Sequence, residues 1–213
     1  MKRTAIQWIS LGILIMIGPG ISENMSASES AVQDIRTLVN EYNQQIEQHT
    51  DAGGREGPQK MTLSGSVVER AVGPMQKTIT IYYDLNETMP EPGRFDVNAV
   101  SRKAIFKEQS AWKTVREYVY DSSGTLIFFF QTHDGPHDYP ETRIYFLEQK
   151  PVRIVIDPMS PMDDGSLETD DTSEDRSGTR DYSDMTETDR LQAEHILADS
   201  QIFQQLAVLF GKL

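Results

Sequence analysis

Two imidazoles and two carboxylates lie within six consecutive residues of this chain. The cluster comprises His133, Asp134, His137 and Asp138. Divalent transition metals favour such ligands, so the cluster is a candidate metal site. The glycine and proline between the two histidines disfavour a helix, and the loop does not pin a third and fourth ligand. A polar hairpin loop therefore fits better, and no cofactor is predicted.

Aromatic and arginine side chains alternate along the strands predicted around this loop. Trp112, Arg116 and Tyr118 stand at even spacings, which places them on one face of a strand. An aromatic sheet face edged with arginines suits an extended or anionic ligand. A core beneath helices, with arginine stems reaching water, fits the same pattern better. The predicted ligand-binding residues are Trp112, Arg116, Tyr118, Tyr120, Phe128, Arg143 and Tyr145.

Motifs for catalysis are missing from the sequence. There is no G-x-S-x-G, no H-E-x-x-H and no G-x-x-x-x-G-K-[ST], and the acidic region does not match an EF-hand loop. Glu117 and Glu141 could form an acid/base pair, but only geometry decides that. His195 is expected to be a core or partly buried histidine of the last helix. The chain is predicted not to be an enzyme.

The first 22 residues have the pattern of a secretory signal. Lys2 and Arg3 precede an apolar run over residues 8–17, which Gly18 and Pro19 end. Gly20 and Ser22 are small residues at the −3 and −1 positions of a cut after residue 22. The apolar run is about half the length that a membrane span requires.

Composition restricts the classes of function. The net charge of −13 argues against nucleic acid and anionic membrane surfaces as partners. The absence of cysteine excludes disulfide scaffolds, thiol catalysis and thiolate metal sites. The length after residue 22 suits one domain with a sizeable core.

Hydrophobic periodicity predicts a helix, a strand-rich region and a second helix. Val32, Ile35 and Val39 begin the apolar stripe of a helix over residues 28–49. Short links with turn chemistry indicate an antiparallel meander, in which Gly124 takes positive φ. Several strands are apolar on both faces, so we expect them to lie between two layers. The predicted strands are 61–71, 76–84, 101–107, 112–120, 125–132, 142–147 and 152–156.

The region after the strands changes character twice. Residues 159–184 are acidic and poor in apolar side chains, so a disordered linker is predicted. A helix over residues 186–209 follows, with Thr186 and Asp189 as its cap. Its predicted docking face consists of Leu191, Ala198, Ile202, Leu206 and Leu209.

A pattern in the strand region resembles one that recurs in uncharacterised exported bacterial proteins. The run over residues 116–128 (REYVYDSSGTLIF) is followed by ETRIYF at 141–146 and VRI at 152–154. The resemblance covers roughly residues 112–156. It implies an export-associated β domain and brings no activity or catalytic residues.

These observations predict an α+β fold. An N-terminal helix packs on a curved antiparallel meander of about seven strands, and an acidic linker leads to a C-terminal amphipathic helix that docks back. The expected segments are a signal peptide at 1–22, a helix-plus-sheet domain at 23–158, a linker at 159–184 and the helix at 185–213. The predicted function is a non-enzymatic periplasmic or secreted domain that binds a protein, a peptide or an envelope component. The alternatives are a half-barrel carrier of a lipid or other apolar ligand and a metal-dependent hydrolase.

The export prediction can be checked by mass. Protein purified from the envelope fraction of cells that make it should have the mass of residues 23–213 and begin at Glu23. Intact-mass spectrometry with N-terminal sequencing measures both. A full-length mass that retains Met1 would contradict cleavage after Ser22.

Overall fold

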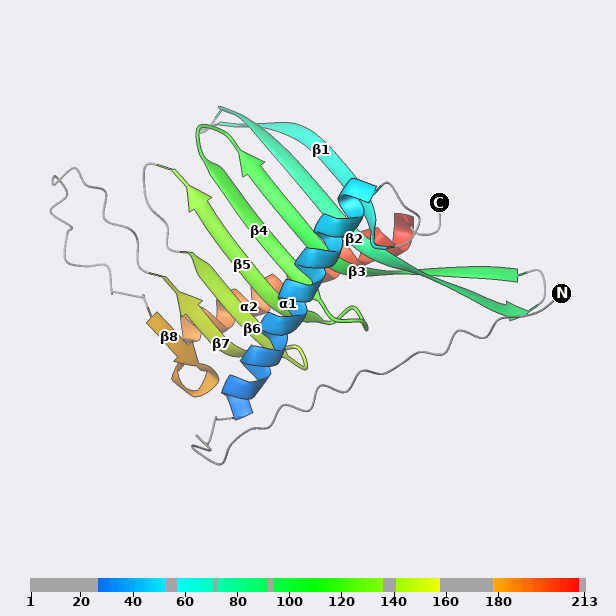
Figure 1. The fold of residues 1–213 in the computed structure, drawn as a ribbon. Helices are drawn as coiled ribbons and strands as arrows, with labels where there is room; N and C mark the ends of the chain where they lie inside the picture. Colours follow the sequence, from blue (N-terminus) through cyan, green and yellow to red (C-terminus); the bar gives the residue numbers. More distant parts are fainter. Residues whose placement is uncertain are drawn as a thin grey trace, which may run out of the picture.

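The computed structural model describes residues 27–52, 57–70, 73–91, 94–135, 141–157 and 178–210. Two helices lie on opposite sides of one open, curved sheet (Figure 1). The elements in order are α1 (Ala27–Ala52), β1 (Gln59–Glu69), β2 (Gly73–Glu91), β3 (Arg94–Gln109), β4 (Lys113–Tyr120), β5 (Leu126–Asp134), β6 (Thr142–Leu147), β7 (Lys150–Ile156), β8 (Gly178–Asp181), the 3-10 helix η1 (Tyr182–Asp184) and α2 (Glu187–Phe210).

The sheet is an antiparallel meander of eight strands in sequence order, β1 to β8. The predicted class, helix on curved meander with a C-terminal helix, is confirmed. The predicted strand number was one too few, because β8 pairs with β7 inside the segment assigned to the linker. The hairpin of β2 and β3 is also longer than expected, since its pairing continues to Glu91 and Arg94.

Two hairpin turns follow from their residues. Gly124 has a φ of 82°, as predicted, and the Asp121 carboxylate accepts hydrogen bonds from the backbone N–H groups of Ser123 and Thr125. Glu148 and Gln149 link β6 to β7 and both have positive φ. That pattern is typical of a type I′ turn, whose twist matches that of the flanking strands.

Helix α1 covers one face of the sheet. Its buried residues Val32 and Ile35 pack against Val119, Ile127 and Tyr145. The stripe predicted from periodicity is therefore the packed face. Its residues Val39 and Tyr42 are partly buried against the same cluster.

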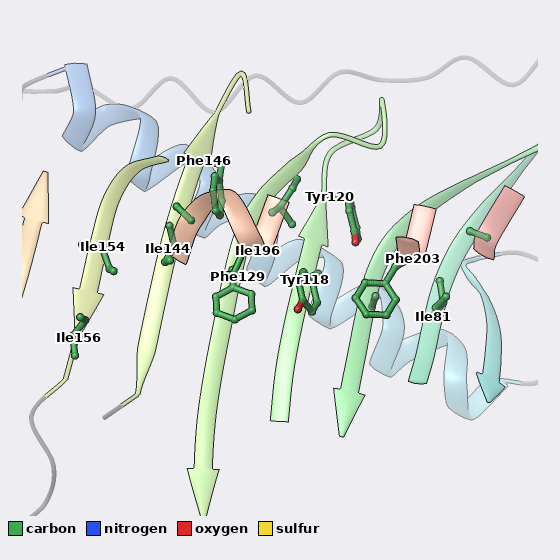
Figure 2. Close-up of a cluster of buried hydrophobic side chains, with 14 of the residues drawn as sticks. Ile81, Tyr118, Tyr120, Phe129, Ile144, Phe146, Ile154, Ile156, Ile196 and Phe203 are labelled. Carbon is green, nitrogen blue, oxygen red and sulfur yellow. The ribbon is translucent and has the colours of Figure 1, made fainter. Parts of the chain in front are cut away.

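Helix α2 covers the opposite face through a larger cluster (Figure 2). Its side chains Ile196 and Phe203 pack with Tyr118, Phe129 and Ile144. The predicted docking face of this helix was wrong in most positions. The exposed residues are Leu191, Ala198, Ile202 and Leu209, whereas Ala193, Ile196, Ser200, Phe203 and Ala207 are buried.

Three β-bulges form a row across the sheet beneath α1. The pairing registers shift opposite Tyr82–Tyr83, Val119–Tyr120 and Tyr145–Phe146, which leaves one extra residue each in β3, β5 and β7. These extra residues are Arg102, Ile127 and Val152. Each bulge turns two successive side chains toward α1. The pairs are Arg102 with Lys103, Ile127 with Phe128, and Val152 with Arg153.

Charged groups attach both helices at their first turns. Arg153 of β7 pairs with Glu29 of α1 and with Asp181 of β8. At α2, the Thr186 N–H donates to Asp189 and the Asp189 N–H donates to Thr186 Oγ1, which is the predicted cap. Arg180 of β8 donates to both carboxylate oxygens of Asp189, at 3.0 and 3.3 Å.

Some predicted segments lie outside the described residues. These are residues 1–22 and residues 158–177 of the acidic region. Residues 178–184, which were assigned to the linker, form β8 and η1. Among the described helices, none has a stretch long and apolar enough to cross a membrane.

The buried Asp189 gives a stability prediction. Burial alone would raise the pKa of Asp189, but hydrogen bonds from Thr186 and the Arg180 guanidinium outweigh it, so its pKa is lowered. Asp189→Ala should reduce the free energy of unfolding by about 3 kcal/mol, because it leaves Arg180 and the helix cap without their acceptor. Urea unfolding at pH 7 measures the loss.

The matched control is Asp184→Ala, which removes an exposed carboxylate of η1. It should leave stability within about 0.5 kcal/mol of the wild type. A carboxyl group whose pKa is lowered by folding stabilises the fold at pH values above its unfolded-state pKa. This stabilisation is lost as the pH falls through the folded-state pKa. The difference between wild type and Asp189→Ala should therefore shrink below pH 4. Equal stability of both variants at pH 7 would contradict the assigned role.

Candidate functional site

The predicted ligand-binding residues lie on two opposite faces of the sheet. Tyr118 and Tyr120 lie beneath α2 and are 1% and 0% exposed. Phe128, Arg143 and Tyr145 lie on the α1 side, where Tyr145 is buried as well. The residues therefore do not form one contact face, and most of the aromatic ones belong to the core.

Trp112 and Arg116 remain accessible beside α2. Trp112 precedes β4 and is 38% exposed, and the Arg116 side chain is 34% exposed. Both lie where β3, β4 and β5 extend past the helix. We call the strand residues of this region the α2-side strip. They are Phe106, Glu108, Thr114, Arg116, Gln131 and His133.

A hollow of about 440 Å³ lies between the strip and α2. Tyr118 and Phe129 line it from the sheet, next to Arg116 and Gln131. The helix contributes the other wall. Its lining residues are Thr188, Leu191, Gln192, His195, Ile196 and Asp199. Apolar and polar groups thus face each other across a space large enough for a ligand side chain.

Arg116 is held in place by its neighbours. Its Nε donates to Gln131 Oε1 at 3.1 Å, and its guanidinium lies 5.6 Å from the ring centre of Phe106. Its Nη2 lies 3.8 Å from a carboxylate oxygen of Glu108. A guanidinium fixed in this way loses little conformational entropy when it binds an anionic group.

A second, smaller hollow of about 140 Å³ adjoins the strip at Trp112. Met75, Glu108, Thr114 and His133 line it with Trp112. Glu108 connects the two hollows, because it lines this one and contacts Arg116 of the other.

The candidate metal site is only partly within the described residues. His133 Nδ1 and Thr114 Oγ1 are hydrogen-bonded at 2.8 Å, and Asp134 is exposed at the end of β5. His137 and Asp138 lie outside the described residues. In the part of the chain that the structure describes, no three His, Asp or Glu side chains come together in a way that could hold a metal ion.

The acid/base pair considered from sequence is neutralised by cations. Glu117 pairs with Lys103 at 2.8 Å, and Glu141 pairs with Arg143 at 2.8 Å. Arg143 also pairs with Asp157 and lies over the Phe130 ring. These contacts connect neighbouring strands on the face opposite the strip.

Sequence reasoning missed the helix wall of the larger hollow. His195 was expected to be a core or partly buried histidine, but it is exposed and lines the hollow with Asp199. The spacing of four residues between them was a usable signal, because it places both side chains on one helical face. Gln131 was recognisable only from its pairing with Arg116 across β4 and β5.

Tyr118 at the floor of the hollow gives a pH prediction. Burial, with the nearby Asp199 carboxylate, raises the pKa of Tyr118 to about 12. An unfolded tyrosine ionises near pH 10, so this contribution to stability is complete below pH 10 and is lost as pH rises toward 12. Between pH 9 and 11.5, the free energy of unfolding of Tyr118→Phe should therefore fall by about 2 kcal/mol less than that of the wild type.

Chemical unfolding between pH 9 and 11.5 measures this effect. Tyr182→Phe, at an exposed tyrosine of η1, is the control and should follow the wild-type curve. Identical alkaline curves for Tyr118→Phe and the wild type would show that this phenol is not buried in solution.

Comparison of the chain with protein-family models, curated proteins and solved structures gave no match.

Proposed function

We propose that the protein is an exported, non-enzymatic binding domain whose site is the α2-side strip with its two hollows. The N-terminal 22 residues support export. The observation that carries the site is Arg116, a partly exposed cation fixed among aromatic and amide groups between two hollows. Sites of this kind combine an apolar surface with a few placed polar groups.

The composition of the larger hollow favours a ligand with an apolar group next to an anionic one. Phe129, Leu191 and Ile196 offer apolar surface, and Arg116 lies at the border. A guanidinium recognises a carboxylate through paired hydrogen bonds. A peptide that ends in an apolar residue with a free carboxyl terminus combines both features.

Nearby acids limit how the anion can be recognised. Glu108 lies 3.8 Å from Arg116, and Asp199 lines the same hollow. The positive potential around Arg116 is therefore local, and the whole chain is acidic. Direct contact with the guanidinium, rather than long-range attraction, would select the ligand.

The carrier alternative is not supported by the packing beneath α2. A lid over an apolar ligand requires space between helix and sheet. The ring centres of Phe203 and Tyr118 are instead 4.9 Å apart, and the Tyr120 hydroxyl donates to the Ser200 carbonyl. Side chains of the protein itself therefore fill the layer around Phe203 and Ser200, next to the hollow at Arg116.

Fluorescence tests the proposal directly, because Trp112 is the only tryptophan after residue 22. The probes are short peptides that end in an apolar residue, each made with a free and with an amidated carboxyl terminus. The free-carboxylate forms should change Trp112 emission with micromolar affinity. Arg116→Gln should weaken binding by roughly 10- to 100-fold, since a charge-assisted hydrogen-bonded contact contributes about 1.5–3 kcal/mol.

The control is Arg190→Gln, which removes the same charge from an exposed position on α2, near Tyr182. Its affinity should equal that of the wild type. Equal binding of free and amidated peptides, or unchanged affinity in Arg116→Gln, would overturn the assignment of the site. Circular dichroism confirms that both variants are folded.

A further inference from the structure

Strand β1 forms one edge of the sheet and presents a long outer side (Figure 1). Its inner side pairs with β2 over all eleven residues, Gln59 to Glu69. Among the described residues, no strand pairs with its outer side. Val67 and Val68 are 45% and 79% exposed near its end.

This edge lacks the features that usually prevent strand pairing. Proteins protect edge strands with charges, prolines, bulges or short length. Residues 61–68 of β1 (MTLSGSVV) contain no charge and no proline. The pairing with β2 has no register shift, so β1 carries no bulge. An unprotected edge of this length is a template for another strand.

The residues of β1 are complementary to a second copy of the strand. A two-fold axis through Ser64 pairs antiparallel strands over all eleven residues. The residue numbers of two directly opposed residues then add to 128. Met61 therefore faces Val67, Leu63 faces Gly65 and Thr62 faces Ser66. Apolar side chains meet on the α2 side, where Met61 packs against the core. Hydroxyl groups meet on the other side, beside the Thr62–Thr80 and Ser64–Thr78 contacts.

We propose that two copies of this chain associate through β1, antiparallel and centred on Ser64, to form one continuous sheet. In this register no two charges of β1 are directly opposed, since Lys60 faces Val68 and Glu69 faces Gln59. Parallel pairing would place like charges together, which is unfavourable. Moving the axis to Gly65 would oppose Lys60 to Arg70 and Met61 to Glu69. An axis at Leu63 would leave Val68 and Glu69 outside the pairing.

The first test measures mass in solution by light scattering at tens of micromolar protein. The wild type should have the mass of two chains. Ser64→Lys should raise the dissociation constant of the dimer by roughly 100-fold or more, because it sets two lysines directly opposite each other at the axis. Ser64 is exposed, so the variant should keep the thermal stability of the monomeric fold. Ser123→Lys, in the exposed β4–β5 turn, should remain dimeric.

The second test determines the register with single cysteines, since the chain has none of its own. Residues opposed across antiparallel strands have Cα atoms about 4.5–5.5 Å apart, within disulfide range. Ser64→Cys should therefore oxidise to a covalent dimer. In Thr62→Cys the two thiols would be four residues out of register, about 13 Å apart, and should not cross-link. A monomeric wild type, a dimer that Ser64→Lys leaves intact, or equal cross-linking of both cysteines would overturn the proposal.

Discussion

The row of three bulges beneath α1 determines how the two sides of the sheet differ. A bulge adds one residue to a strand and reverses the alternation of side chains beyond it. Here Arg102, Ile127 and Val152 are added at one level across the sheet. Each bulge gives α1 two neighbouring side chains where a regular strand would give one. The helix thus rests on a widened band of contacts, and its position depends on the alignment of the bulges.

The bulges also explain which parts of the fold the sequence could predict. The two helices, the first seven strands and the Gly124 turn depend on local signals and were predicted correctly in type and order, whereas β8 was missed. The face of a given side chain depends on register, which local alternation does not reveal across a bulge. Leu126 and Phe128 differ by two positions, yet they pack on opposite faces, because Ile127 is the extra residue between them.

Helix α2 shows a second limit of pattern reasoning. Its largest apolar residues suggested one stripe, but the helix docks with a stripe on nearly the opposite side, which consists of Ala193, Ile196, Ser200, Phe203 and Ala207. Ala193 and Ala207 allow α2 to approach the sheet closely, and Phe203 fills the space between. Hydrophobicity ranks leucine above alanine, whereas close packing rewards shape. The α2 wall of the larger hollow was missed as well, because all the predicted site residues were taken from the strand region.

The attachment of α1 has a consequence for the order in which the chain can fold. Glu29 at its start contacts Arg153 of β7, and Val32 packs on residues of β4, β5 and β6. Helix α1 must therefore wait for more than a hundred further residues before its packing surface exists. A high contact order of this kind slows folding. Until β7 has paired, α1 is an amphipathic segment whose apolar stripe remains uncovered.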